Sequence, residues 1–327
     1  MDIIKELKRH DILGRSGSGF PAHLKWQMVK NCNASQKFIV CNGSEGEPKN
    51  YKDKYILKKY PEYVVEGIKQ ALLAIPNSTA FFYLRKDYYR KFGRKLRKLS
   101  WGCDIEITKK IGRYLGGEET TICEAIETGT AEPRIKPPYP AQKGILGCPT
   151  LVSNVETFYC AGKIARGEYK GERFYTIEGG AKKRGVFKAS KDATIKQILE
   201  ETNNLPKFDF FVQAGGGAMG EILLPKELDK QIEGIGCIVV FNRKKTDPIK
   251  LMKQWAAFFL AENCDKCTPC REGIYRINEI ISKKELDGKT LDDLFFVLEK
   301  TSLCPLGKNA FRPFETLIKK LGLCRKR

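Results

Sequence analysis

Histidine is scarce in this 327-residue chain, which contains only His10 and His23. Histidine-based zinc sites and histidine-activated hydrolases need such a side chain beside the other reacting groups. The sequence therefore argues against a hydrolase. With 42% hydrophobic and 30% charged residues, the composition is that of a folded globular protein, and the length suits about two to three domains.

Long apolar runs are also missing. Runs such as residues 235–241 and 255–261 are far shorter than the roughly 18 residues that a membrane-spanning helix requires. The N-terminal residues scatter charges among apolar positions and lack the uninterrupted core of a signal peptide. We predict no direct membrane insertion and a cytoplasmic location, with membrane association only through a larger complex.

Acidic residues are fewer than basic ones. The chain contains 59 Lys and Arg and 39 Asp and Glu, so its net charge is +20. Such a balance suits an anionic partner. The densest basic run, residues 85–98, interleaves aromatics with bases as binders of single-stranded nucleic acid do. A solvated lysine-rich helix face, or a loop that meets an acidic protein, explains the same run. Since no nucleic-acid motif accompanies the bases, we predict no nucleic-acid partner.

Four of the 12 cysteines are placed as metal ligands. Cys264, Cys267 and Cys270 form a CxxCxxC run, and Cys304 follows downstream, directly before Pro305. Bacterial-type [4Fe–4S] binding uses this spacing with a Cys-Pro fourth ligand, whereas structural zinc uses two separate pairs. We predict a [4Fe–4S] cluster, with zinc and chance spacing as alternatives. The scattered cysteines are expected to be small buried residues: Cys32, Cys41, Cys103, Cys123, Cys148, Cys160, Cys237 and Cys324.

Helical patterns flank the clustered cysteines. Asp247 followed by Pro248 predicts a helix start, and an apolar stripe continues from it through Leu251, Trp255, Phe258 and Phe259. Thr290 and Asp293 resemble a second capping box, which would place Cys304 just past the next helix. A small helical bundle is therefore expected to hold the cluster.

Glycine-rich segments characterise the first half of the chain. GRSGSGFPAHLKW (14–26) lets the backbone approach a phosphate or ring, and Lys25 adds charge. Its spacing matches neither GxGxxG nor the P-loop pattern. A strand expected at 38–42 opens into GSEGEPKNYKD (43–53), and α/β sheets bind ligands in loops at the carboxyl ends of their strands. A plain surface turn is the alternative.

Two predicted helix starts flank a proline-rich loop. Residues 111–129 predict a glycine turn and a helix with Glu118 and Glu119 in its first turn, ending at Gly129. Residues 133–149 hold five of the 15 prolines and are expected to form an ordered loop. Ser153 and Glu156 then predict a capping box, and the amides of that helix would suit an anion.

Together the motifs resemble those of one family. They are GRSGSGFPAHLKW, CNGSEGEPKNYKD, YLGGEET, PRIKPPYPA, PTLVSNVETF, CDKCTPCREG and CPLG, and they run from about Gly14 to Leu321. The family is the flavin-carrying, NADH-binding subunit of respiratory complex I, shared with NAD-linked hydrogenases and formate dehydrogenases. The resemblance implies an α/β fold with three domains: a Rossmann-like FMN- and NAD(H)-binding domain over 1–170, a ubiquitin-like β-grasp (SLBB) domain over 171–246, and a helical [4Fe–4S]-binding domain over 247–327. The strand-like and helical segments between 172 and 246 suit a β-grasp unit.

The resemblance also assigns cofactor-binding residues. Positions that match FMN contacts are Gly14, Arg15, Gly17, Gly19, Lys25, Asn42, Glu45, Tyr114, Gly117, Glu118, Glu119, Asn154 and Thr157. Positions that match NADH contacts are Phe20, Glu47, Lys136 and Tyr139. The implied reaction passes hydride from NAD(P)H to FMN and single electrons to the cluster. Because the cofactors carry this chemistry, no catalytic acid or base is expected.

Several positions depart from the family's usual residues. Ser44 and Lys49 stand where aspartate and glycine are common, and both changes make the pocket less acidic. NADPH in place of NADH is therefore a hypothesis. Arg113 and Leu115 are expected to reshape the pocket wall. The chain begins almost at the first glycine motif and carries no further ferredoxin domain, so part of the family's docking surface is expected to be absent.

The predicted function is an NADH dehydrogenase (diaphorase) module of a larger redox complex. Its expected partners are other redox subunits, including a small iron–sulfur protein, and the final electron acceptor would be reached through other chains. A non-catalytic electron-relay subunit that keeps the cluster but has lost flavin is the alternative. A basic, metal-stabilised nucleic-acid-binding protein is a third and weaker interpretation.

Overall fold

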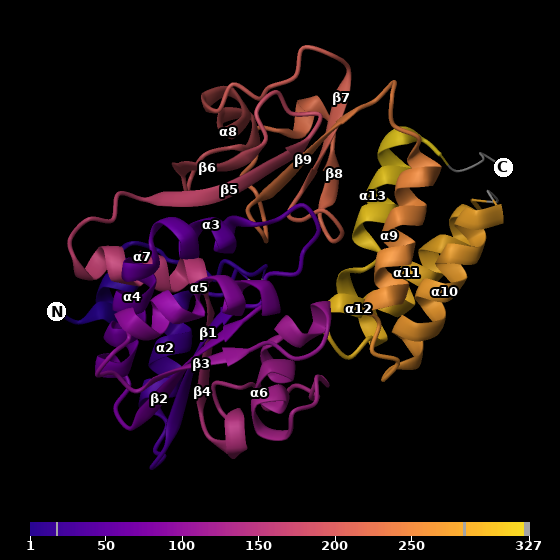
Figure 1. The fold of residues 1–327 in the computed structure, drawn as a ribbon. Helices are drawn as coiled ribbons and strands as arrows, with labels where there is room; N and C mark the ends of the chain where they lie inside the picture. The colour runs from indigo at the N-terminus through magenta and orange to yellow at the C-terminus, as the bar shows by residue number, and fades with distance from the viewer. Residues whose placement is uncertain (18, 284–285, 324–327) are drawn as a thin grey trace. The chain divides into compact units, whose positions relative to one another are not determined.

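The computed structural model describes residues 1–17, 19–283 and 286–323, and the chain forms two compact units (Figure 1). The first comprises Met1–Gly46 and Tyr51–Phe174, and the second comprises Glu47–Asn50 and Tyr175–Arg327. The short segment Glu47–Asn50 thus packs with the second unit, although the chain on either side of it belongs to the first. Among the described helices, none has the length and apolar character needed to span a membrane.

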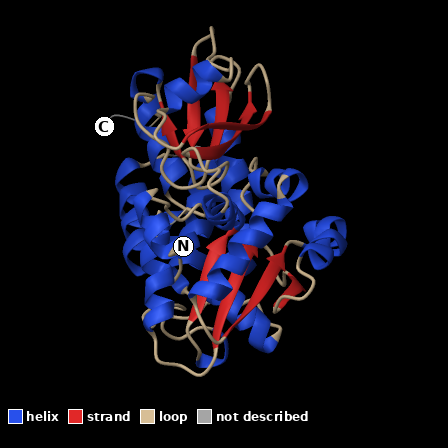
Figure 2. Ribbon diagram, turned by 90° about the vertical axis from the view of Figure 1, so that its left-hand side faces the viewer, coloured by secondary structure: helices blue, strands red, loops and turns tan. Residues whose placement is uncertain are grey.

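A four-stranded parallel sheet lies at the centre of the first unit (Figure 2). Its strand order is β3-β2-β1-β4, and all neighbouring pairs are parallel. The strands are β1 (Lys37–Gly43), β2 (Ser78–Leu84), β3 (Ile105–Lys109) and β4 (Thr150–Asn154). The strand expected at 38–42 is β1, and all of its residues are buried. Helices cover both faces of such a sheet, which is why β1 and β2 are nearly continuous apolar runs.

In the described part of the first unit, seven α-helices accompany this sheet. They are α1 (Ile3–Arg9), α2 (Ala22–Asn31), α3 (Lys52–Lys59), α4 (Pro61–Ala74), α5 (Lys86–Leu99), α6 (Glu119–Thr128) and α7 (Val155–Ala165). Helix α6 ends at Gly129, whose φ is 77°, as predicted, whereas Glu118, which was expected in the first turn, is the N-cap. The basic run 85–98 forms α5, which confirms the expected lysine-rich helix.

Two predicted capping boxes are wrong. Ser153 belongs to β4, and the N-cap of α7 is Asn154, whose side chain accepts the backbone N–H of Glu156 at 3.0 Å. In the second unit, α11 (Gly288–Thr301) begins earlier than expected, and Asp287 caps it by accepting the backbone N–H of Thr290. In both places another short polar side chain, rather than the expected residue, adopts the N-cap geometry that lets it reach the first turn.

A five-stranded mixed sheet begins the second unit. Its order is β6-β5-β9-β7-β8, with β5 and β9 parallel and β7 antiparallel to both β9 and β8. The strands are β5 (Glu172–Gly179), β6 (Gly185–Ser190), β7 (Phe210–Ala214), β8 (Glu221–Leu223) and β9 (Cys237–Asn242). Helix α8 (Ile195–Glu201) packs its apolar side against this sheet. The strand-like segments FYTIEGG (174–180), GVFKAS (185–190), DFFVQAGGG (209–217) and CIVVF (237–241) overlap β5, β6, β7 and β9, while the short β8 was not foreseen.

Helices make up the rest of the second unit. They are α9 (Pro248–Glu262), α10 (Thr268–Lys283), α11, α12 (Pro305–Asn309) and α13 (Arg312–Leu321). The predicted start of α9 is confirmed, because Asp247 caps it and Pro248 is its first residue. Cys304 follows α11, as expected. The mixed sheet and these helices form one compact unit, and the division into three domains at 170 and 246 stays a prediction.

Helices α4 and α7 pack together through two glycines. A Cβ at Gly67 would lie 1.9 Å from the carbonyl oxygen of Phe158, and a Cβ at Gly162 would lie 1.9 Å from that of Tyr63. Each helix therefore places a glycine against the backbone of the other. No larger residue permits this separation, because backbone atoms cannot move aside as a flexible side chain can.

Replacing either glycine should force the two helices apart. We expect Gly67→Ala and Gly162→Ala each to lower the free energy of unfolding by about 2 to 4 kcal/mol, the range of severe overpacking. Gly93→Ala in α5 is the control, since its Cβ would meet nothing closer than 3.6 Å, and it should stabilise the helix by up to about 1 kcal/mol. Urea denaturation measures all three. Similar effects at Gly67 and Gly93 would contradict the close helix contact.

Candidate functional site

Three residues predicted to bind FMN meet at the carboxyl edge of the parallel sheet. Asn42 is the second-last residue of β1 and Asn154 ends β4, and these strands are neighbours. The side-chain amide of Asn42 donates to the carbonyl oxygen of Gly117 at 2.9 Å, and that of Asn154 donates to the carbonyl oxygen of Asn42 at 3.3 Å. This is the edge at which open α/β sheets bind ligands.

The first turn of α7 contains a buried hydroxyl that can accept a ligand contact. Thr157 is 1% exposed, and within the described residues its Oγ1 has no hydrogen-bond partner. Leaving such a group unsatisfied costs about 1 to 3 kcal/mol. Arg15 is also buried, and its positive charge helps to keep the pKa of Glu156 below its ordinary value despite the opposing effect of burial. A polar ligand group at this helix end would satisfy Thr157, so the residues present fit a phosphorylated cofactor.

Two lysines and two glutamates form a compensated charge cluster beside this edge. Lys25 Nζ lies 2.9 Å from Glu119, and Lys136 Nζ lies 2.9 Å from Glu118 and 3.3 Å from Glu119. Burial raises the pKa of Glu119, but the two ammonium charges outweigh it and hold that pKa below its usual value. All four side chains were predicted site residues. Their charges cancel, so the cluster carries little net charge.

Two of the residues predicted to contact NADH have exposed aromatic rings. Phe20 is 41% exposed and Tyr139 is 50% exposed, and Lys136 Nζ lies 5.9 Å from the centroid of the Tyr139 ring. Phe20 ends the glycine loop, which closes through a hydrogen bond from the Gly14 N–H to the Phe20 carbonyl oxygen at 2.8 Å. Large exposed aromatics suit stacking on a nicotinamide or adenine ring.

The glycine loops adopt conformations that favour glycine. Gly17 and Gly19 have φ angles of 110° and 61°, a region that other residues rarely enter. At Gly117 a Cβ would lie 2.4 Å from the hydroxyl oxygen of Ser44. Tyr114 begins the short 3-10 turn Tyr114–Gly117, with its ring beside Gly46. These contacts bring Gly117 and the loop after β1 into close approach.

A buried charge network lies beneath this edge, and sequence reasoning missed it. The ammonium of Lys52 contacts Asp53 at 2.6 Å, the side-chain oxygen of Asn154 at 2.9 Å and Glu156 at 3.2 Å. Lys52, Asp53 and Glu156 are each at most 2% exposed. Burial lowers the pKa of Lys52, but the charges of Asp53 and Glu156 outweigh it, so the pKa lies above its ordinary value. The only local signal was a charged helix start, which ordinarily indicates a solvated surface.

Glu45 is held inside the first unit by three donors. Its carboxylate accepts the backbone N–H groups of Asp53 at 3.1 Å and Lys54 at 3.2 Å, and the hydroxyl of Tyr88 at 2.7 Å. It thereby caps the start of α3. Burial and the neighbouring carboxylate of Asp53 raise the pKa of Glu45 to about 7. The flavin contact predicted for Glu45 stays a prediction.

Glu47 belongs to the second unit, unlike the other predicted cofactor residues. Its carboxylate accepts the backbone N–H groups of Ala218 at 2.8 Å and Met219 at 3.0 Å. Gly216 permits this approach, because a Cβ there would lie 2.4 Å from a Glu47 oxygen. The acidic loop 43–53 therefore contributes Glu45 to one unit and Glu47 to the other.

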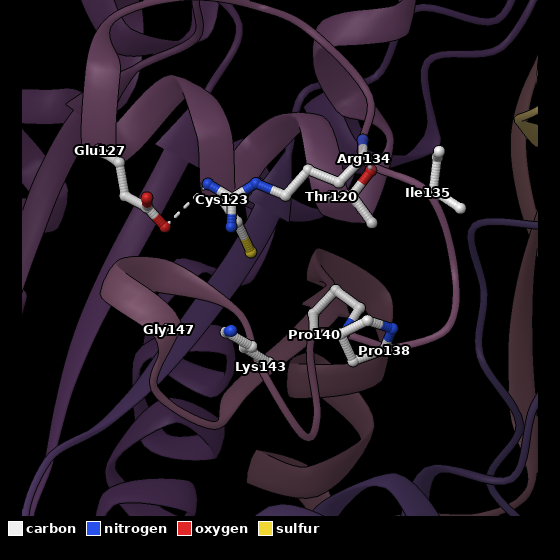
Figure 3. A pocket seen from close by; sticks show the side chains of 9 residues that line it. All are labelled: Thr120, Cys123, Glu127, Arg134, Ile135, Pro138, Pro140, Lys143 and Gly147. Carbon is white, nitrogen blue, oxygen red and sulfur yellow. Dashed lines mark hydrogen bonds and ion pairs between the residues drawn. The ribbon is translucent and has the colours of Figure 1, made fainter.

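The proline-rich loop borders a pocket of about 310 Å³ in the first unit (Figure 3). Arg134 crosses its wall and pairs with Glu124 and Glu127 at 2.8 Å each. Cys123 lies in the wall, where burial raises the pKa of its thiol to about 12. The remaining lining residues are Thr120, Ile135, Pro138, Pro140, Lys143 and Gly147. Arg134 is neutralised by its partners, so the pocket offers little net charge to a ligand.

The four predicted ligand cysteines lie on two segments of the helical part. Cys264 and Cys267 are in the turn between α9 and α10, Cys270 is in the first turn of α10, and Cys304 is the N-cap of α12. A Cβ at Gly307 would lie 3.2 Å from Cys270, so α10 packs against the segment after Cys304. Burial and the other three thiols raise the pKa of Cys270. Across the described residues, no three His, Cys, Asp or Glu side chains converge as they would around a single metal ion.

The scattered cysteines divide into two groups. Cys41, Cys123, Cys160 and Cys237 are buried, as predicted, whereas Cys32, Cys103 and Cys148 are partly exposed, so the expectation is wrong for those three. Cys324 lies outside the described residues. Burial raises the pKa of the Cys41 and Cys160 thiols, which keeps them protonated and unreactive.

The raised pKa of Glu45 makes stability depend on pH. Its folded pKa of about 7 exceeds the ordinary 4.5, so the folded state retains a proton that the unfolded chain releases. Its contribution to stability is therefore complete below pH 4.5 and is lost as the pH rises towards 7. Relative to Glu45→Gln, the wild type should lose roughly 3 kcal/mol of unfolding free energy between pH 4 and pH 8.

Glu124→Gln is the control for this comparison. Its hydrogen bond from Arg134 keeps the pKa of Glu124 below 4.5, so its effect on stability should be the same at pH 5 and pH 8. Denaturant titrations across the range measure both variants. A constant difference between wild type and Glu45→Gln would show that Glu45 titrates as an ordinary carboxyl group.

Two family models match separate parts of the chain. The Nuo51 FMN-binding domain matches residues 7–162, and the NADH-ubiquinone oxidoreductase-F iron-sulfur binding region matches residues 250–322. The first match contains the carboxyl edge of the parallel sheet. The second contains all four cysteines predicted as cluster ligands.

Whole proteins and solved structures also resemble the chain. The alpha subunit of the NAD-reducing hydrogenase HoxS of Cupriavidus necator is 29% identical, with 97% of this chain and 59% of that protein aligned. A crystal structure of an NAD+-reducing [NiFe]-hydrogenase in the H2-reduced state superposes with a TM-score of 0.89 at 26% identity, over 99% of this chain and 63% of that chain. The chain thus spans about three-fifths of the length of these hydrogenase polypeptides.

A further relative is similar over most of its length. The F subunit of the NADH-quinone oxidoreductase of Rhodobacter capsulatus is 30% identical, with 97% of this chain and 85% of that protein aligned. The two matched family models lie at either end of the chain, over the parallel sheet and over the cysteine-bearing helices. The chain therefore belongs to the family of NADH-quinone oxidoreductase F subunits, which confirms the resemblance seen in its motifs.

Proposed function

We propose that this chain is an NAD(P)H-oxidising module that binds FMN in its first unit and a [4Fe–4S] cluster in its second. The observation that carries the proposal is the buried, unsatisfied hydroxyl of Thr157 in the first turn of α7, at the carboxyl edge of the parallel sheet. Membership of the oxidoreductase family supports the same assignment. When bound, FMN would supply the step between a two-electron hydride donor and a one-electron acceptor.

Several residues would hold the flavin. Thr157 and the N-terminal amides of α7 suit its phosphate, and Lys25 is close enough to the same edge to contact Glu119 and the carbonyl oxygen of Val152. Asn42 and Asn154 join the ends of β1 and β4, so they set the floor of the site. The loop before α2 contains Gly14, Gly17 and Gly19, which allow its backbone to approach the cofactor.

The nicotinamide nucleotide would be recognised by the remaining predicted residues. Phe20 and Tyr139 expose rings that can stack on the bases, and Lys136 carries a charge beside Tyr139. Glu47 is assigned to the same ligand by resemblance alone. Ser44 donates to the Asn42 side chain at 2.5 Å and carries no charge, so the floor beneath the site lacks the aspartate common in the family.

The four cysteines would hold the cluster. Thiolate ligands in a CxxCxxC run with a distant Cys-Pro are the donor set of a [4Fe–4S] centre, and the iron-sulfur binding region of the family matches this part of the chain. The cluster would supply one-electron transfer. Cys270 and Cys304 are buried, whereas Cys264 and Cys267 are partly exposed, so solvent would reach one side of the cluster.

We also assign the domain character and partners by the same reasoning. The mixed sheet with α8 corresponds to the predicted SLBB β-grasp domain, and the C-terminal helices correspond to the cluster-binding bundle. The relatives are named as subunits, so we propose other redox subunits as partners, among them a small iron–sulfur protein. The cytoplasm is the proposed location.

Replacement of Thr157 tests the proposed flavin site through FMN affinity, without a measurement of enzymatic turnover. Thr157→Val should weaken FMN binding by about tenfold, the value of one lost hydrogen bond. The flavin-free protein should unfold at the same denaturant concentration or a higher one, because a buried unsatisfied hydroxyl has been replaced by a methyl group of equal size. Flavin fluorescence quenching gives the affinity, and urea denaturation gives the stability.

Thr150→Val is the matched control. Thr150 is equally buried, but its hydroxyl accepts the Ile145 N–H at 2.9 Å and donates to the Cys148 carbonyl oxygen at 3.0 Å. This variant should lose stability without a comparable loss of FMN affinity. If Thr157→Val binds FMN as tightly as wild type, Thr157 does not contact the flavin.

The cluster assignment predicts a loss of iron from each ligand variant. After anaerobic reconstitution the wild type should contain about four iron and four sulfide per chain. Replacement of Cys264, Cys267, Cys270 or Cys304 by serine should abolish most of this content. Cys148→Ser, at a partly exposed scattered cysteine, should retain it. Wild-type protein that takes up zinc but no sulfide would instead establish a zinc site.

Retention of FMN distinguishes the proposed function from the alternative of an electron-relay protein. Under the proposed function, wild-type protein retains FMN, and NADH or NADPH bleaches its absorbance under anaerobic conditions. If reconstituted protein contains iron and sulfide but never takes up FMN, the relay interpretation replaces the proposed one.

A further inference from the structure

Helix α5 presents a broad basic face that no carboxylate neutralises among the residues that the structure describes. Its exposed bases are Lys86, Arg90, Lys91, Arg94, Lys95, Arg97 and Lys98. The one acidic residue of the helix, Asp87, pairs with Arg85 at 2.7 Å, and Arg97 donates to the hydroxyl of Tyr89. Within the described part of the chain, no carboxylate pairs with the other six exposed bases.

The opposite side of α5 is part of the core of the first unit. Tyr88, Phe92 and Leu96 are at most 5% exposed, at the helical spacing that places them on one stripe. Because this apolar stripe is buried, the basic side of α5 faces solvent. Because the helix has 14 residues, this face is about 21 Å long.

A highly exposed tryptophan follows directly after the helix. Trp101 is 88% exposed, although it lies in an ordered turn closed by a hydrogen bond from the Cys103 N–H to the Ser100 carbonyl oxygen at 3.0 Å. Gly102 permits this turn with a φ of 75°. An exposed indole in an ordered turn is a costly surface feature, and tryptophan is a frequent anchor of protein interfaces.

The position of this tryptophan separates it from the cofactor edge. Helix α5 starts after the carboxyl end of β2 and leads back to the start of β3 (Figure 1), so Trp101 lies at the amino edge of the parallel sheet. Leu73, 77% exposed near the end of α4, lies at the same edge because α4 leads into β2. The carboxyl edge, with Asn42 and Asn154, is opposite.

We propose that α5 and Trp101 form a docking surface for an acidic polypeptide, which holds the chain in its complex and is anchored at the amino edge of the parallel sheet, away from Asn42 and Asn154. The bases provide long-range attraction and orientation, and Trp101 provides the apolar anchor. A protein partner is favoured because the relatives are named as subunits, so this inference rests on the proposed function. A flat membrane fits poorly, since the bases spread over half of the helix circumference and the apolar side of α5 is buried.

The proposal is tested by binding of poly-L-glutamate to the full chain. The triple variant Arg94→Glu, Lys95→Glu, Lys98→Glu should weaken binding at least about tenfold at low salt, because three attractive charges become repulsive. The control reverses Lys182, Lys183 and Arg184, which are exposed in the second unit and change the net charge equally. It should weaken binding by no more than about twofold, the part owed to net charge.

Trp101→Ala tests the anchor without changing charge. With a random copolymer of glutamate and tyrosine as the probe, whose rings an indole can contact, this variant should weaken binding about three- to tenfold, as removal of an interface anchor does. Phe296→Ala, at a 62% exposed ring of α11, should have no effect. Circular dichroism and thermal melting confirm the fold of every variant. FMN uptake should be unchanged in all of them, which separates failure of the docking surface from failure of the proposed function.

Other outcomes would overturn the proposal. If the two triple variants weaken polypeptide binding equally, net charge alone accounts for the attraction. If Trp101→Ala binds the polypeptide as tightly as wild type, Trp101 is not an anchor. Tighter binding of duplex DNA, or of phosphatidylglycerol vesicles, at the same salt concentration and through the same three bases would assign the surface to nucleic acid or lipid instead.

Discussion

The buried ammonium of Lys52 is the interaction on which the candidate cofactor edge depends. Its three oxygen partners come from the start of α3, the end of β4 and the first turn of α7. An unpaired buried charge would cost several kcal/mol, whereas one surrounded by acceptors can be accommodated. The start of α3, the end of β4 and the start of α7 are therefore held together by one cation.

This network also controls the charge beneath the proposed flavin site. Glu156 stays ionised because Lys52, Arg15 and Arg173 offset its burial and keep its pKa low. Glu45, by contrast, has a pKa raised to about 7 by burial and by Asp53. Two buried glutamates of the same unit thus hold different protonation states near neutral pH. The difference follows from which neighbours carry positive charge.

Local patterns predicted several elements of this fold, and particular residues show why. The buried run of β1, the Gly129 end of α6 and the Asp247-Pro248 start of α9 depend on residues close in sequence. The N-caps of α7 and α11 were misassigned because several short polar residues compete within a few positions. Strand β8 was missed because three residues carry too little alternation to be recognised.

By itself the sequence determined the family, the cysteine spacing, several of the helices and strands, and the basic character of α5. Only the tertiary structure decided that Lys52, Asp53 and Glu156 are buried together, that Thr157 keeps an unsatisfied hydroxyl, and that Glu47 packs in a different unit from Glu45. Periodicity and capping arise from neighbours along the chain, so they are visible in its order. The burial and pairing of a charge depend on segments distant in sequence, which only the folded chain brings together.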